Sequence, residues 1–245
     1  YPFDTTSMTN DTYKLRASGW DSDSESFALA ESGWFNITNQ VPSITTFTVL
    51  NPDAGTGASL SDRAWFNIGT QGTLSFRWGA SDDDLKQATL ANVPGPGTPP
   101  TDGPTSLSYG WDWASGSMQE GTWSPRLTVQ DHSGLSNTST LFIGIDRTGP
   151  TIGSVTVGDG GAWQQSTEVT VSGLMTEADD GQGSGVASVD YALNGGAWTT
   201  TTSDAVDLTL TEGVHALTLR ATDRVGNTGA TSTVTVRVDQ TAPIG

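Results

Sequence analysis

Residues 213–223 read Gly-Val-His-Ala-Leu-Thr-Leu-Arg-Ala-Thr-Asp, and their spacing indicates the fold class. Apolar or aromatic side chains stand at every second position from His215 to Ala221, which is the pattern of a β-strand with one buried face. Similar patterns with the same spacing occur at Asp11–Asp21 and Gly121–Asp131, and an aspartate closes each of them. The repetition predicts a tandem array of one β module.

Prolines mark the joints between the modules. Pro42, Pro150 and Pro243 each follow a short polar run, and the apolar positions around them match from one joint to the next. Proline cannot donate to a strand ladder and stiffens the backbone, so it suits a linker. The sequence predicts the C-terminal part of a module at residues 1–41 (module one), whole modules at 42–149 (module two) and 150–242 (module three), and the start of another at 243–245.

Module one lacks the strands that should precede its repeat strand. Strands are expected at Thr12–Gly19 and Trp34–Thr38, with an acidic loop between them. Two or three strands alone rarely hold together in water. We therefore expect the chain to be a section of a longer protein, with the missing half of module one supplied by the same chain or by a neighbouring protomer in a head-to-tail assembly.

Composition narrows the range of partners. The 245 residues carry a formal net charge of −17 and no cysteine. Such a surface repels nucleic acid and anionic lipid. The negative charge is typical of proteins in a salty, ion-rich exterior, or it serves only to keep the protein soluble. The sequence has no apolar run long enough to enter a membrane. Modules of this size do not need disulfides, so the lack of cysteine is compatible with the extracellular or cell-surface location that we expect.

Two modules resemble known families. Module two resembles the PKD-type Ig-like domains at Tyr109–Trp113 and Leu127–Ser136, although Ala114–Ser117 replaces their usual Gly-Asp-Gly turn. Module three resembles the Ig-like repeats of bacterial and archaeal surface proteins at Gly183–Tyr191 and Leu219–Asn227. The resemblance implies an all-β fold of tandem Ig-like β-sandwich modules joined by short Pro-containing linkers. It implies little about function, because such modules serve as spacers, adhesins and enzyme appendages.

The chain offers little for catalysis. His215 occupies the position of Tyr13 and Trp123 in the repeat, so a core or corner role is expected for it. His132 follows Asp131 in a turn and is expected to be solvated. The sequence contains no zinc-type cluster, phosphate loop or nucleophile elbow. We therefore expect no enzymatic activity.

Acidic turns are the candidate metal sites. In an Ig-like sandwich the B–C and F–G loops lie at the same pole as the incoming linker. Calcium takes six to eight oxygens, often from loops, whereas the plainer alternative is a set of hydrated turns. The expected ligands are Asp146, Glu177, Asp179, Asp180 and Asp223 for module three, and Asn39, Asp82, Asp84 and Asp131 for module two.

Aromatic side chains and sequons offer weaker signals. Trp111 and Trp113 should share one strand face, either as core residues or as a carbohydrate-stacking platform. Trp20 lies in an acidic turn. Asn-x-Ser/Thr sequons, candidate glycosylation sites, occur at Asn10, Asn36 and Asn137.

These observations leave two hypotheses about function. In the first, the chain is a non-catalytic structural section of a long extracellular or cell-surface protein, such as a fibre, an S-layer or a stalk. In the second, it is an adhesin or a glycan-binding accessory module of a secreted hydrolase. The exposure of the tryptophans is expected to distinguish the two hypotheses, since a glycan platform needs exposed indoles.

Overall fold

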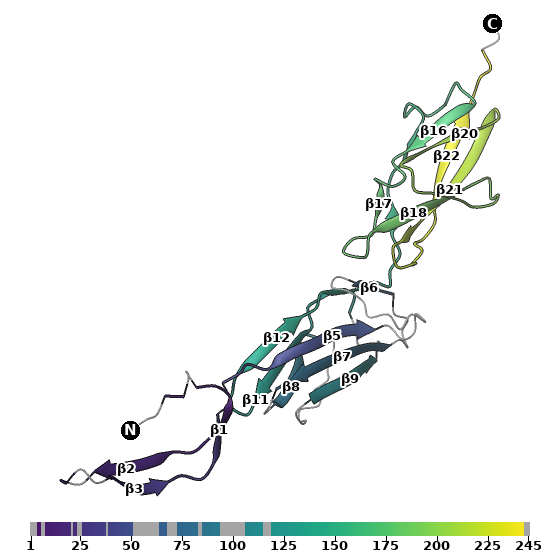
Figure 1. Ribbon diagram of the computed structural model, residues 1–245. Coiled ribbons are helices and arrows are strands. Elements are labelled where there is room, and N and C mark those ends of the chain that lie inside the picture. The colour runs from purple at the N-terminus through teal and green to yellow at the C-terminus, as the bar shows by residue number, and fades with distance from the viewer. Residues whose placement is uncertain are drawn as a thin grey trace.

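The computed structural model describes residues 4–5, 8–20, 22–23, 26–37, 39–50, 64–67, 73–82, 85–93, 106–114 and 119–242. All regular elements in these ranges are β-strands, which confirms the all-β prediction. Figure 1 shows a two-stranded ribbon, a first sandwich and a second sandwich following one another along an extended molecule. The described part of the chain contains no apolar helix of membrane-spanning length.

Module one is a long, bent two-stranded ribbon. Strand β1 (Asp11–Tyr13) pairs with β4 (Phe35–Ile37), and β2 (Arg16–Trp20) pairs with β3 (Ser26–Glu31), both antiparallel. The acidic loop expected between the first and last strands is shorter than predicted, because β3 occupies much of it.

Module two is a sandwich with three sheet segments. Its largest buried side chains include Phe76, Leu74, Leu127 and Ile145, which meet in one core. The sheet orders are β5–β7–β9, β12–β11–β8 and β10–β13–β6. The strands are β5 (Ser43–Leu50), β6 (Ala64–Phe66), β7 (Thr73–Ser81), β8 (Leu85–Ala91), β9 (Ser106–Ala114), β10 (Gly121–Trp123), β11 (Arg126–Asp131), β12 (Ser136–Thr140) and β13 (Ile143–Ile145).

Module three has its own core, in which Val171, Leu174, Leu217 and Leu219 are fully buried. Its main sheet has the order β19–β18–β21–β22, and the facing sheet has the order β15–β16–β20. The strands are β14 (Thr151–Ile152), β15 (Thr156–Val157), β16 (Glu168–Ser172), β17 (Ala178–Asp179), β18 (Val186–Leu193), β19 (Thr199–Thr201), β20 (Ala205–Thr209), β21 (Gly213–Asp223) and β22 (Ser232–Val238).

The repeat strand is continuous in module three alone. β21 runs unbroken from Gly213 to Asp223, and its odd-numbered side chains from 215 onward are buried. In module two the same stretch divides into β10 and β11 at Ser124 and Pro125, because proline cannot donate to the ladder. β10 pairs with β13 and β11 pairs with β12, which are consecutive strands. The repeat strand of module two is therefore bent, but both of its parts stay in the same hairpin.

The hairpin after β18 closes in a tight turn. Asn194 and Gly195 have positive φ angles of 50° and 70°, and Gly196 N donates to Leu193 O at 2.9 Å. Two successive residues of positive φ match the twist of a tight hairpin. The buried His215 lies beside this turn, with its Nδ1 3.1 Å from Asn194 Nδ2. The prediction of a structural role for His215 agrees with this position.

Candidate metal centre

The closing aspartate of the repeat strand organises a tight turn. Asp223 N donates to Asn227 O at 3.0 Å. Its Oδ1 accepts from Val225 N at 2.9 Å and from Asn227 N at 2.8 Å, and its Oδ2 accepts from Asn227 Nδ2 at 2.7 Å. A carboxylate that accepts several N–H bonds is held in one orientation. The turn therefore fixes one buried carboxylate at the pole of module three.

Module two repeats this turn with one difference. Asp131 Oδ1 accepts from Leu135 N at 2.8 Å and from Ser133 Oγ at 2.7 Å. Asp131 is 0% exposed, and its Oδ2 has no hydrogen-bond partner among the described residues. The reason is a side chain: Leu135 stands at the position where Asn227 supplies an amide in module three.

The linker aspartate belongs to both modules. Asp146 directly follows β13, and its N–H donates to Phe66 O of module two at 3.0 Å. On the other side, its Oδ2 accepts from Ser184 N at 2.7 Å, and its carbonyl oxygen accepts from Asn227 Nδ2 at 3.1 Å. The side chain is buried. Asp146, near the end of module two, therefore contacts the loops of module three.

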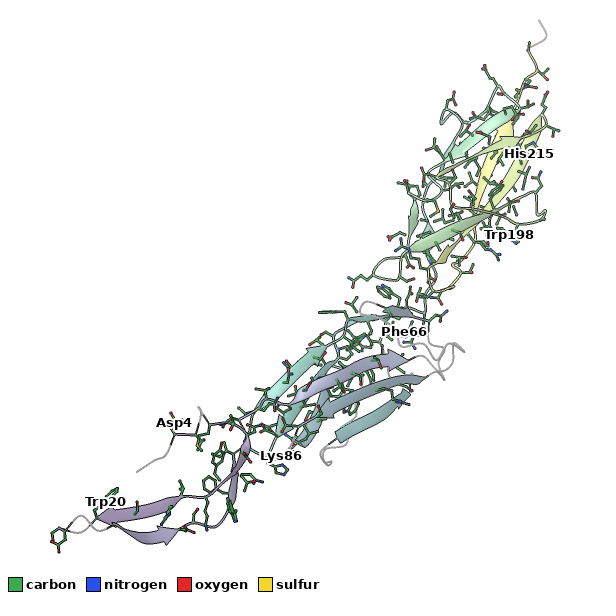
Figure 2. All side chains as sticks on the ribbon, viewed as in Figure 1. Asp4, Trp20, Phe66, Lys86, Trp198 and His215 are labelled. Atoms are coloured by element: carbon green, nitrogen blue, oxygen red, sulfur yellow. The ribbon has the colours of Figure 1, made fainter. Side chains whose placement is uncertain are left out.

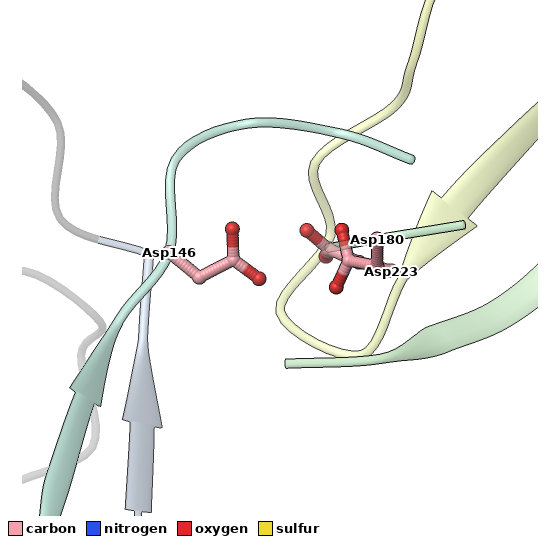
Figure 3. A group of neighbouring side chains, drawn as sticks. All are labelled: Asp146, Asp180 and Asp223. Carbon is pink, nitrogen blue, oxygen red and sulfur yellow. The ribbon is translucent and has the colours of Figure 1, made fainter. Parts of the chain in front are cut away.

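Asp180 completes the group from the loop after β17. Its Oδ2 accepts from Gly185 N at 2.6 Å. Oxygen atoms of Asp146, Asp180 and Asp223 all lie within 4.8 Å of one another. In Figure 3 the Asp146 carboxylate faces those of Asp180, from the loop after β17, and Asp223, from the end of β21. A cavity of about 240 Å³ beside the group is lined in part by Asp146, Asp180 and Glu120.

The electrostatics of the group favour a positive charge. Burial raises the pKa of Asp180, and the negative charges of Asp146, Asp223 and Asp179 raise it further, against the hydrogen bond from Gly185 N. Like charges held close together disfavour ionisation. In addition, the buried Ser184 Oγ has no hydrogen-bond partner among the described residues. A bound cation would relieve the repulsion that these carboxylates exert on one another.

The remaining predicted ligands lie elsewhere. Glu177 is not in the group; its side chain lies against Gly153 and Gly173. Asp179 is exposed, and its Oδ1 accepts from Gly181 N at 2.8 Å, which is the geometry of an ordinary turn.

The predicted pole of module two is only partly visible. Asp82 is half-buried, and Asp84 lies outside the described residues. Asn39 N donates to Asn10 Oδ1 at 2.7 Å, so this residue ties the linker to module one. Asp131 is therefore the member of the expected group whose free oxygen the structure locates.

The sequon asparagines take part in hydrogen bonds. Asn36 Oδ1 accepts from Thr12 Oγ1 at 2.9 Å, and Asn137 Nδ2 donates to Pro42 O at 3.0 Å. Asn137 thus links module two to its own incoming linker. Glycosylation of Asn10, Asn36 and Asn137 stays a prediction.

The structure gives a partial answer on the aromatic residues. The side chains of Trp111 and Trp113 lie outside the described residues, and Trp20 is exposed. An aromatic cluster that the sequence did not reveal lies on the β10–β13–β6 sheet, where Trp65, Trp123 and Phe142 line a cavity of about 350 Å³. Gly144 permits this arrangement, because a β-carbon there would meet the Trp65 ring.

Ser184 and Asn227 are the two residues of the site that sequence reasoning missed. Ser184 contributes a backbone donor, which no residue pattern indicates. Asn227 carried a detectable signal, since a side-chain amide four residues after a strand-closing aspartate is well placed to reach that carboxylate.

Comparison with known proteins finds only distant likenesses. No family model matches this chain, and no curated protein does. Fibronectin(III)-like modules of CbhA from Clostridium thermocellum share 15% identity over 81% of this chain and 94% of theirs, with a TM-score of 0.33. Titin domains A168–A170 share 12% sequence identity over 93% of this chain and 73% of theirs, with a TM-score of 0.43. Drosophila N-cadherin EC1-4 shares 13% sequence identity over 94% of this chain and 58% of its own, with a TM-score of 0.35.

Such low TM-scores and identities carry no argument about what this chain binds or does. The prediction of tandem Ig-like sandwiches is confirmed, whereas the resemblance of module two to PKD-type domains stays a prediction.

Proposed function

We propose that this chain is a non-catalytic structural section of a long extracellular or cell-surface protein, in which consecutive modules are held at a fixed geometry. The observation that carries the proposal is Asp146, which is hydrogen-bonded to Phe66 of module two and to Ser184 and Asn227 of module three. A flexible linker between independent domains would show few contacts across the boundary.

Further contacts cross the same joint. Asn67 Nδ2 of module two donates to Val225 O of module three at 3.3 Å. Across the joint, the backbone of Thr228 lies so close to Gly149 that a β-carbon there would collide with it. Directly after the joint, Gly229 is packed against Pro150 O in the same way. Backbones at this separation leave little room for rotation about the linker. The joint therefore supports a spacer or stalk role, which requires a defined direction from one module to the next.

Calcium is the cation we propose for this joint. It prefers carboxylate and carbonyl oxygens presented by loops, which is what Asp146, Asp180 and Asp223 offer. The ligands come from both modules, so a bound ion would join them. We extend the proposal to the pole of module two, where Asp131 has a buried carboxylate oxygen without a donor.

Two variants of Asp146 separate the protein contacts from the ion. Asp146→Asn keeps an oxygen that can accept from Ser184 N but removes the charge, whereas Asp146→Ala removes both. We expect calcium to raise the melting temperature of the full chain, since a ligand that binds the folded state stabilises it. Asp146→Asn should lose this response, and Asp159→Asn, which removes an exposed charge of module three outside the group, should keep it.

Small-angle scattering then tests the joint itself. In chelator, Asp146→Asn should keep the maximum dimension of the wild type, and Asp146→Ala should give a broader distribution of distances. Equal distributions for all three chains would argue against a joint organised by Asp146. Identical wild-type melting with calcium and with chelator, at matched ionic strength, would reduce the acidic group to solvated turns.

Glycan binding is the second candidate function, and the aromatic cluster of Trp65, Trp123 and Phe142 on module two favours it. Phe142 is 49% exposed and lines the same cavity as Trp65 and Thr122, so rings and a hydroxyl lie together as a sugar site requires. Affinity electrophoresis in gels containing soluble polysaccharides tests this candidate. Retardation of the wild type that is lost in Phe142→Ala would support it, and equal mobility in every gel would exclude it for those glycans.

A further inference from the structure

The ribbon of module one is the last hairpin of a sandwich, as its register shows. In β1–β4, Tyr13 pairs with Phe35, and in β10–β13, Trp123 pairs with Ile143. Both ladders are antiparallel and three pairs long, and β2–β3 continues from the first as β11–β12 continues from the second. Module two therefore shows what normally surrounds this hairpin.

In module two the hairpin carries one additional strand on each part. β6 lies parallel to β13, with Ala64 opposite Ile143 and Phe66 opposite Ile145. β8 lies antiparallel to β11. With these neighbours and the facing sheet in place, Ile143 and Ile145 are buried and Leu127 is 0% exposed.

The inner face of the ribbon of module one is covered only in part, since Ile37 is 6% exposed and Phe35 is half-buried. Within the described residues, β4 pairs with β1 alone and β2 pairs with β3 alone. Leu15 is 47% exposed, although Pro125 at the same place in module two is buried. Ala17 is exposed where Leu127 is fully buried. An open strand edge beside apolar side chains is a template for another strand.

We propose that β4 accepts one further β-strand, in parallel, from another module of this repeat, in the position that β6 takes on β13. Backbone hydrogen bonds along the free edge of β4 supply the affinity, and alternate side chains supply the register. The strand that fits has apolar residues two positions apart, as Ala64 and Phe66 are. These residues meet Phe35 and Ile37 on the inner face of the ribbon.

A synthetic peptide tests this acceptor edge on the full chain. The probe is residues 61–70, Ser-Asp-Arg-Ala-Trp-Phe-Asn-Ile-Gly-Thr, which contains the β6 sequence. Titrated into the isotopically labelled protein, it should give saturable amide shifts at Phe35, Asn36 and Ile37. A three-residue ladder predicts a weak complex, with a dissociation constant on the order of 0.1–1 mM. Amide exchange of the same residues should slow in its presence.

Two controls make the outcome decisive. In the parallel register of β6 on β13, the amide that faces the partner strand belongs to Phe66. The peptide with Phe66→Pro therefore lacks one ladder donor and one apolar side chain, and it should bind at least tenfold more weakly. Trp34→Ser changes an exposed ring next to β4 and should leave peptide binding intact, whereas Phe35→Ser should remove it. Absence of shifts in β4 at about 1 mM wild-type peptide, or equal binding of the proline peptide, would overturn the proposal. The amide signals near Asp146 report on the joint between modules two and three, whereas those of β4 report on the peptide. Failure of one proposal can therefore be told apart from failure of the other.

Discussion

Giving Asp131 the donor that it lacks should stabilise module two. The change is Leu135→Asn, which reproduces the arrangement of module three, where Asn227 Nδ2 donates to Asp223 Oδ2 at 2.7 Å. The backbone of the two turns is the same, since Leu135 N and Asn227 N each donate to the aspartate Oδ1 at 2.8 Å. The new amide should therefore reach Asp131 Oδ2 without rearrangement.

Two opposing contributions set the change in unfolding free energy that Leu135→Asn causes. A hydrogen bond to a buried carboxylate contributes about 1.5–3 kcal/mol. Leu135 is 36% exposed, so losing its partial burial costs less than the roughly 1.5–3 kcal/mol of a fully buried leucine. The net expectation is a gain of about 1 kcal/mol, or roughly 4 °C in the melting temperature of a module of this size.

Scanning calorimetry in chelator measures this gain without interference from bound calcium. Leu135→Ala is the matched control, because it loses the same apolar contacts and supplies no donor, so it should melt below the wild type. If the asparagine variant is no more stable than the alanine variant, then Asp131 Oδ2 already has a donor, and the comparison of the two turns is wrong.

Three further changes test other parts of the structure. Because burial and neighbouring charges raise the folded-state pKa of Asp180 above its unfolded value, its ionisation opposes folding at neutral pH. Asp180→Asn should therefore raise the melting temperature in chelator at pH 7, lose that advantage as the pH falls below the folded pKa, and abolish the calcium response. Gly144→Ala places a methyl group against the Trp65 ring and should lower the unfolding free energy of module two by about 1–3 kcal/mol in urea titrations. Asn194→Gly suits the positive φ but leaves His215 Nδ1 without its amide partner, so module three should lose about 1–2 kcal/mol by the same measurement.

The repeat spacing predicted the strands because it reports a physical requirement. A sandwich strand must place every second side chain in the core, so Leu217, Leu219 and Ala221 are readable from sequence alone. The position of Asp223 followed from the same spacing, since the residue that closes the strand must begin the turn.

Other features depend on distances between residues in the folded chain, which the spacing of residues in the sequence does not reveal. Nothing in the sequence separates Asp180 from Asp179, because the two are adjacent in one loop and only the fold of that loop decides which carboxylate turns toward Asp146. Strand β3 was missed since its acidic surroundings resemble a loop. The packing of Trp65 on Gly144 joins segments far apart in the chain, and a glycine in a strand does not reveal which ring will cover it.

The crowded contact between Gly229 and Pro150 O has a consequence for long arrays. A joint that permits one orientation imposes the same twist and the same advance each time it is repeated. An array of such joints would trace a superhelix whose pitch depends on the packing at a single glycine. A residue larger than glycine at position 229 would collide with Pro150 O, so the shape of such an array would depend on a residue that touches no partner.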